Sequence, residues 1–104
     1  MIKGRLKKLS TPKQKKIIEL FRNLFTSGFH LAEIVDFLRR SALLEEAYVA
    51  EMRSGLAAGQ SFSQIMKRLG FSDNVVTQLS LSELHGNLNL SLGKIEDYLE
   101  NLSK

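Results

Sequence analysis

Apolar residues recur at intervals of three and four along most of this chain, which is the spacing of one face of an α-helix. The first such stripe is formed by Ile17, Ile18, Phe21, Leu24 and Phe25. A hydroxyl residue followed by a proline, at Ser10-Thr11-Pro12, is typical of a helix start. Gly28 suits the left-handed position that often follows the last helical residue. These signals predict a first helix that ends just before Gly28.

Four further segments show the same period and are expected at about 31–40, 43–58, 61–69 and 72–85. Ser61 and Ser72 stand where N-caps are preferred, and Gly59 and Gly86 follow two of the apolar stripes. We therefore expect Gly28, Gly59 and Gly86 to mark helix junctions, with positive φ at two or more of them. Gly55 lies inside the third segment and weakens the expectation of a regular last turn there.

The stretch LNLSL at residues 88–92 alternates like a half-buried strand. A helix accounts for more of the sequence, because a longer stripe continues through residues 88, 92, 95, 99 and 102 at spacings of four and three. Asn87 is a good N-cap for this sixth helix. Gly93 lies inside it at a cost of roughly 1 kcal/mol relative to alanine. Two interpretations are open, close helix packing at Gly93 and simple tolerance of the glycine, and we favour packing.

The pattern as a whole predicts an all-α fold, a single-domain antiparallel six-helix bundle at 11–104 that follows a basic arm at 1–10. The chain of 104 residues is long enough for one core. The expected core comprises Phe21, Leu24, Phe25, Leu31, Ile34, Leu38, Phe62, Ile65, Leu79, Leu92, Ile95 and Leu99.

Positive charge is concentrated at the amino terminus. The first 16 residues contain no acid and seven cations, namely Lys3, Arg5, Lys7, Lys8, Lys13, Lys15 and Lys16, whereas the other 88 carry eight basic and eleven acidic groups. A basic arm on a mildly acidic body favours contact with an anionic partner: nucleic acid, lipid headgroups or an acidic protein face. A solvated tail is the alternative.

Motifs for catalysis are missing from the sequence. It has no cysteine, no phosphate-binding glycine loop and no zinc-ligand spacing, so we expect neither an enzyme nor a bound cofactor or metal. His30 and His85 each lie close to a glycine and are interpreted as surface or capping residues. Glu83 continues an apolar stripe toward Gly86, and we expect it to accept hydrogen bonds near the corner between the fifth and sixth helices.

No apolar run approaches the roughly 20 residues that span a bilayer, and no signal-peptide pattern appears. A helix–turn–helix protein would present basic and amide side chains on one exposed helix. Here the helical segments are mixed or acidic, apart from Lys67-Arg68. A DNA-binding domain that uses the basic arm therefore remains the second hypothesis, and direct nucleic-acid binding is not favoured.

Three sequence blocks occur in an order that resembles a known family. They are LFRNLFTSGFHLAEIVDFL at 20–38, GQSFSQIM at 59–66 and SELHGNLNLSLGKIEDYL at 82–99. Together they resemble the cytoplasmic domain of the type II secretion system F / type IV pilus PilC family, over roughly residues 17–100. In this resemblance Gly28, Gly59, Ser61, Glu83 and Gly86 are the structural motif residues.

The resemblance implies a polytopic inner-membrane platform protein, in which two homologous six-helix cytoplasmic domains alternate with transmembrane helices. This chain would be the first of the two, on the cytoplasmic side. Its implied partners are the cytoplasmic assembly ATPase and pseudopilins or other platform components, and self-association stays open. Ser82 stands where relatives often have glycine, and LGFSDNVV lacks their proline. These departures are more similar to the ComGB branch, which implies a role in DNA uptake during competence.

Overall fold

A computed structural model describes residues 9–102, which form six α-helices and no β-strand. The helices are α1 (Thr11–Thr26), α2 (Leu31–Ser41), α3 (Glu46–Ala57), α4 (Phe62–Leu69), α5 (Asp73–His85) and α6 (Leu88–Leu102). The expected all-helical class is confirmed. The stretch at 88–92 is the start of α6, and Leu90, which is off the apolar stripe, is 58% exposed.

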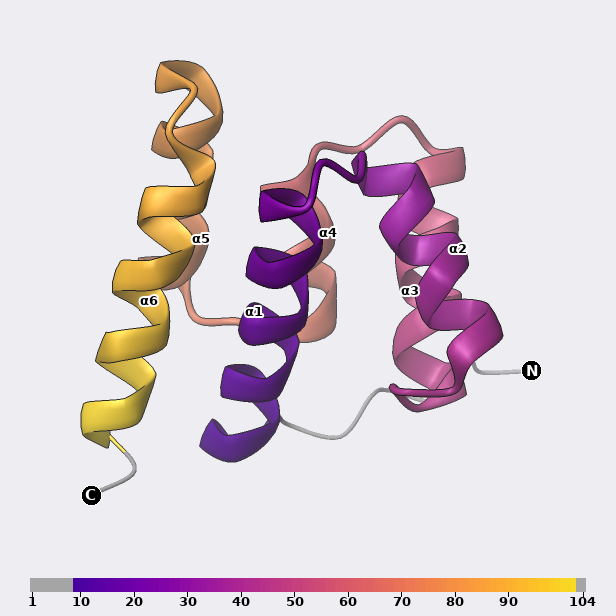
Figure 1. The fold of residues 1–104 in the computed structure, drawn as a ribbon, viewed down its shortest axis with the longest axis horizontal. Helices are drawn as coiled ribbons and strands as arrows, with labels where there is room; N and C mark the ends of the chain where they lie inside the picture. Colours follow the sequence, from indigo (N-terminus) through magenta and orange to yellow (C-terminus); the bar gives the residue numbers. More distant parts are fainter. Residues whose placement is uncertain (1–8, 103–104) are drawn as a thin grey trace.

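The helices are arranged as a closed ring. Each helix packs against the next one along the chain, and α6 returns to pack against α1. In Figure 1, α6, α1 and α2 form a front layer, with α5, α4 and α3 behind them. This arrangement brings the first and last helices together although they are far apart in the sequence.

The core lies between these two layers. Phe21 of α1 packs against Phe62 of α4 with ring centroids 4.9 Å apart, and Phe25 meets Phe62 edge-on at 5.4 Å. The expected core residues all belong to this core or pack against it, although Leu24, Phe25 and Leu31 are half-buried rather than buried. Leu9 is also buried, and Ser10 accepts a hydrogen bond from the Lys13 N–H. The folded part of the chain therefore includes these two residues, which the sequence had assigned to the basic arm.

The corners after α1 and α3 have the same hydrogen-bonding pattern. After α1, the N–H of Phe29 donates to the carbonyl oxygen of Leu24, five residues earlier. The N–H of Gly28 donates to the carbonyl oxygen of Phe25, three residues earlier. Gln60 and Gly59 repeat both bonds after α3. This pattern is typical of a helix end with a left-handed residue. The φ values of Gly28, Gly59 and Gly86 are 96°, 75° and 72°, so the expected left-handed conformation is present at all three.

The third helix begins later than its sequence predicts. The expected start near residue 43 is wrong by about one turn, because the chain is still in the α2–α3 connection until Glu45. Ala42 ends α2 in the left-handed region with φ 59°. Leu44 lies in this connection and its side chain is buried in the core. A leucine at this position therefore marks a loop residue that packs into the core and not the first turn of a helix.

Of the two glycines within helices, Gly55 and not Gly93 lies at a close helix contact. A Cβ at Gly93 would lie 3.9 Å from its nearest neighbour, the Cδ of Arg22, so close packing does not explain this glycine. A Cβ at Gly55 would instead lie 2.6 Å from Cγ1 of Ile65. Gly55 is therefore the residue that permits close contact between α3 and α4.

Candidate functional site

The amino-terminal end of α4 brings together two of the predicted motif residues. Ser61 is its N-cap, and the Ser61 hydroxyl accepts a hydrogen bond from the N–H of Gln64 at 3.3 Å. The Gln64 side chain accepts in return from the N–H of Ser61 at 2.8 Å. Such a reciprocal pair satisfies backbone donors that have no partner within the helix.

Glu83 supplies a third acceptor at the same helix end, from α5. Its Oε2 accepts a hydrogen bond from the N–H of Phe62, the first residue of α4, at 3.1 Å. We expected the donor to lie near the corner between α5 and α6, and this was wrong, since the donor is at the start of α4. Glu83 is also exposed and does not lie at the core edge. The reason is that α4 and α5 are packed neighbours joined by a short turn, which places the end of α5 beside the start of α4.

Ser82, the residue before Glu83, has a structural role of its own. It is buried, and its hydroxyl donates to the carbonyl oxygen of Gln78 at 2.7 Å and contacts the hydroxyl of Ser91 in α6. The backbone N–H groups of Gly86 and Asn87 donate to the Ser82 carbonyl oxygen at 2.8 and 3.2 Å. The α5–α6 corner is thus organised around Ser82, and no single residue pattern in the sequence indicated this.

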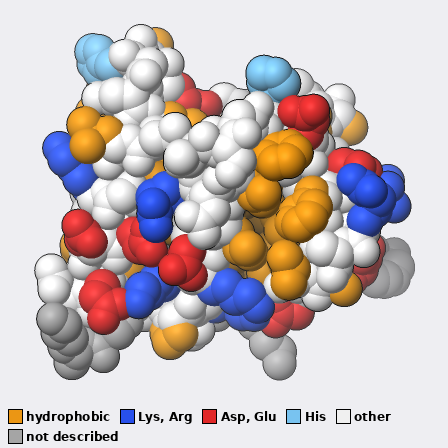
Figure 2. Space-filling view, in the orientation of Figure 1, with side chains coloured by type: hydrophobic (Ala, Val, Ile, Leu, Met, Phe, Trp, Pro, Cys, Tyr) orange, Lys and Arg blue, Asp and Glu red, His pale blue; other side chains and the backbone are white. Residues whose placement is uncertain are grey.

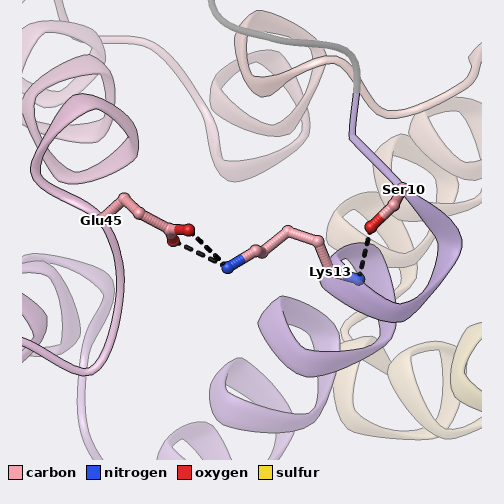
Figure 3. A network of polar contacts seen from close by, with 3 residues as sticks. All are labelled: Ser10, Lys13 and Glu45. Carbon is pink, nitrogen blue, oxygen red and sulfur yellow. Dashed lines mark hydrogen bonds and ion pairs between the residues drawn. The ribbon is translucent and has the colours of Figure 1, made fainter.

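Lys13 lies within the folded body and not in a free arm. Its ammonium group is 2.8 and 2.7 Å from the two carboxylate oxygens of Glu45, the residue before α3 (Figure 3). The hydrogen bond from Lys13 holds the pKa of Glu45 below its ordinary value. This ion pair ties the first turn of α1 to the start of α3.

A second set of ion pairs joins α1 to α6. Lys15 pairs with Glu100 and Arg22 pairs with Glu96. The hydrogen bond to Glu100 raises the pKa of Lys15 above its ordinary value, and that to Glu96 raises the pKa of Arg22. Figure 2 shows acidic and basic side chains interspersed over this face of α1 and α6. The charge that Lys13 and Lys15 could offer to an external anion is therefore partly neutralised within the fold.

The other five predicted contact residues are Lys16 in α1 and four cations nearer the amino terminus. Lys16 is exposed on α1 and no ion pair involves it among residues 9–102. Lys3, Arg5, Lys7 and Lys8 lie outside the described residues.

Among the described residues, the histidines and acidic side chains do not form a metal-binding cluster. His30 and His85 are exposed at helix ends, and the backbone N–H of His30 donates to Glu33 at 2.8 Å. Between residues 9 and 102, no group of three histidine or acidic side chains is placed to hold a metal ion. Across the same residues, each helix is too short or too polar to cross a membrane.

Comparison with known proteins identifies the family. A family model described as type II secretion system (T2SS), protein F matches residues 17–104. The match covers α1 from Ile17 and all of α2 to α6. The chain belongs to this family. Membership implies a platform protein of a secretion or pilus-assembly machine, and the proteins of the family are inner-membrane components with a cytoplasmic domain and are not known enzymes. Searches of curated proteins and of solved structures found no match.

Proposed function

We propose that the chain is a cytoplasmic domain of an inner-membrane platform protein that supports pseudopilus assembly for DNA uptake in competence. In this proposal its six helices act as one antiparallel bundle, the first of two such domains in the full-length protein. It binds the cytoplasmic assembly ATPase and pseudopilins or other platform components. The observation that carries the proposal is the family match over residues 17–104.

The surface chemistry supports a binding role over an enzymatic one. Most of the polar groups in the candidate site are engaged in capping or pairing helices, as Ser61, Glu83 and Lys13 show. A nucleophile or general base needs a reactive neighbour within hydrogen-bonding reach. Several charged groups, among them Glu83, Lys13 and Arg22, instead link one helix to another, which suits a rigid scaffold.

We further propose that the basic arm lies near an anionic surface, the cytoplasmic face of the membrane. Lys3, Arg5, Lys7 and Lys8 of the arm carry this proposal together with Lys16 of α1, because Lys13 and Lys15 are paired with Glu45 and Glu100. Each cation near an anionic membrane contributes on the order of 1 kcal/mol, and salt weakens the attraction. That attraction would orient a domain that is already tethered to the membrane by other segments.

The deciding experiment is a pull-down of the intact membrane protein with its assembly ATPase and pseudopilins. Binding of this chain to anionic liposomes and to duplex DNA is measured beside it, over a range of salt concentrations. Replacing Lys7 and Lys8 by glutamine should weaken liposome binding. Replacing Lys67 and Lys94, which removes the same charge from the helical body, is the matched control and should leave it unchanged.

The alternative, a DNA-binding domain that uses the same arm, predicts a different result. Sequence-specific DNA binding by the chain, with no association between the intact protein and the pilus machinery, would overturn the platform proposal. Association with the ATPase in cells without competence, but with an active secretion machine, would retain the platform and refute the assignment to competence.

A further inference from the structure

A groove lies between α2 and α3, with two arginines, one aspartate and three apolar residues in its lining. Its volume is about 350 Å³, and it is lined by Ala32, Val35, Asp36, Arg39, Arg53 and Leu56. Ala32 is exposed and Leu56 half-buried, whereas Val35 is buried beneath them, so Ala32 and Leu56 provide the accessible apolar part of the lining.

Within the groove, the one carboxylate is already occupied on both oxygens. Oδ1 of Asp36 is 2.8 Å from a guanidinium nitrogen of Arg39, and Oδ2 is 3.0 Å from Nε of Arg40. Both contacts hold the pKa of Asp36 below its ordinary value, Arg39 most strongly. The aspartate therefore stays ionised and paired with α2 residues at neutral pH.

Arg53 on the facing helix has no such partner. No hydrogen bond or ion pair involves its guanidinium within residues 9–102, although it lines the groove and is exposed. The other acids of the two helices do not line the groove: Glu33 accepts from the His30 N–H, Glu51 pairs with Arg68, and Glu46 lies in the first turn of α3. The groove lining thus carries two guanidinium groups against one carboxylate, and that carboxylate is also paired with a third guanidinium, that of Arg40, which is not among the lining residues.

We propose that this groove binds an acidic helical segment of a partner protein. An aliphatic side chain of the segment packs over Ala32 and Leu56, and a neighbouring carboxylate is bound by Arg53 together with Arg39. A guanidinium presents donors in a planar fork that matches a carboxylate, and an amphipathic helix that lays its apolar side chains into a groove is a common mode of recognition. This inference deepens the proposed function by giving the platform a contact surface, and it rests on that function for the existence of a protein partner.

The test uses a synthetic helical peptide of about 15 residues, or roughly four turns, with leucines at i and i+4 flanked by glutamates. A second peptide carries glutamine in place of every glutamate. Binding of each to the 104-residue chain is followed by fluorescence anisotropy, and the contact is located from amide shifts in ¹⁵N-labelled protein. Shifts at Val35, Arg53 and Leu56 with the acidic peptide, and weaker binding of the glutamine peptide, are the expected result.

The matched variants are Arg53→Glu and Lys94→Glu, which change the charge equally on α3 and on the distant α6. Arg53→Glu should weaken binding roughly tenfold, or about 1.4 kcal/mol, and Lys94→Glu by much less. Thermal unfolding by circular dichroism shows that both variants are folded, and Arg53→Lys should bind with intermediate affinity.

Three results would overturn the proposal. One is equal binding of the acidic and glutamine peptides, and another is equal weakening by the two charge reversals. The third is concentration-dependent self-association whose shifts fall on the groove without any peptide, because the occupant would then be a second copy of the chain. A failed peptide experiment beside a successful pull-down would refute this groove and leave the platform function standing.

Discussion

The carboxylate of Glu83, near the end of α5, accepts a hydrogen bond from the backbone N–H of Phe62, the first residue of α4. Phe62 is also the centre of the aromatic contacts with Phe21 and Phe25. The exposed glutamate therefore holds the backbone of a buried side chain in place. A negative charge at this position is also favoured by the dipole of α4.

Removing this acceptor should destabilise the domain. We expect Glu83→Ala to lower the free energy of unfolding by about 1 kcal/mol, as loss of an N-cap does. Glu83→Gln should lower it by less, because the amide oxygen can still accept from Phe62. Urea unfolding at neutral pH measures both, with Asp97→Ala as a control for loss of an exposed carboxylate on another helix. Equal stability of the alanine variant and the wild type would contradict the assigned role.

Replacing each of the two glycines inside helices by alanine should change the free energy of unfolding in opposite directions. Gly55→Ala should destabilise by about 1–3 kcal/mol, because its new Cβ would overlap Cγ1 of Ile65. Gly93→Ala should stabilise by up to about 1 kcal/mol, because alanine favours the helix and its Cβ has room. Thermal and urea unfolding of both variants give the comparison. A stabilised Gly55→Ala variant would show that α3 and α4 can separate without cost.

A core truncation tests the stripe that distinguished helix from strand at the start of α6. Ile95 is fully buried, and Ile95→Ala should cost about 2–5 kcal/mol in unfolding free energy. Leu90 is off the stripe and exposed, so Leu90→Ala should change stability by no more than about 0.5 kcal/mol. Similar losses from the two truncations would mean that the apolar stripe does not define the buried face of α6.

Local signals in the sequence were sufficient for the helices and most of their ends. Ser10, Ser61 and Ser72 cap the helices that they were expected to cap, and Gly28, Gly59 and Gly86 are left-handed at the junctions. These features depend on residues within a few positions of one another. Periodicity likewise identified the core, because it reflects one face of each helix.

The errors concern contacts between helices that are distant in sequence. Glu83 lies 21 residues from Phe62, and Lys15 lies 85 residues from Glu100. No spacing rule connects such pairs, since their meeting depends on how the ring of helices closes. Gly55 and Gly93 are both glycines inside apolar helical segments. The sequence alone could not tell that Gly55 permits close packing and that Gly93 is only tolerated.

The ion pair between Lys13 and Glu45 predicts a pH dependence of stability. The pKa of Glu45 is lowered in the folded state, so its contribution is present above the ordinary glutamate value of 4.5 and is lost as the pH falls through the folded-state pKa. Lys13→Gln should therefore be less stable than the wild type at pH 7, and the difference should shrink as the pH falls below 4.5. Because both groups are partly exposed, salt should also reduce the difference.

Urea unfolding of the two proteins between pH 3 and pH 7, at low and high salt, checks this expectation. Lys16→Gln is the matched control, because Lys16 is one turn away on α1, is exposed, makes no ion pair among the described residues, and lowers the pKa of Glu45 less than Lys13 does. It removes the same charge without breaking the link between α1 and α3. A stability difference for Lys13→Gln that stays constant down to pH 3 would show that the lysine acts through packing of its aliphatic chain and not through Glu45. The same result would return Lys13 to the cations that are free to meet an anionic surface.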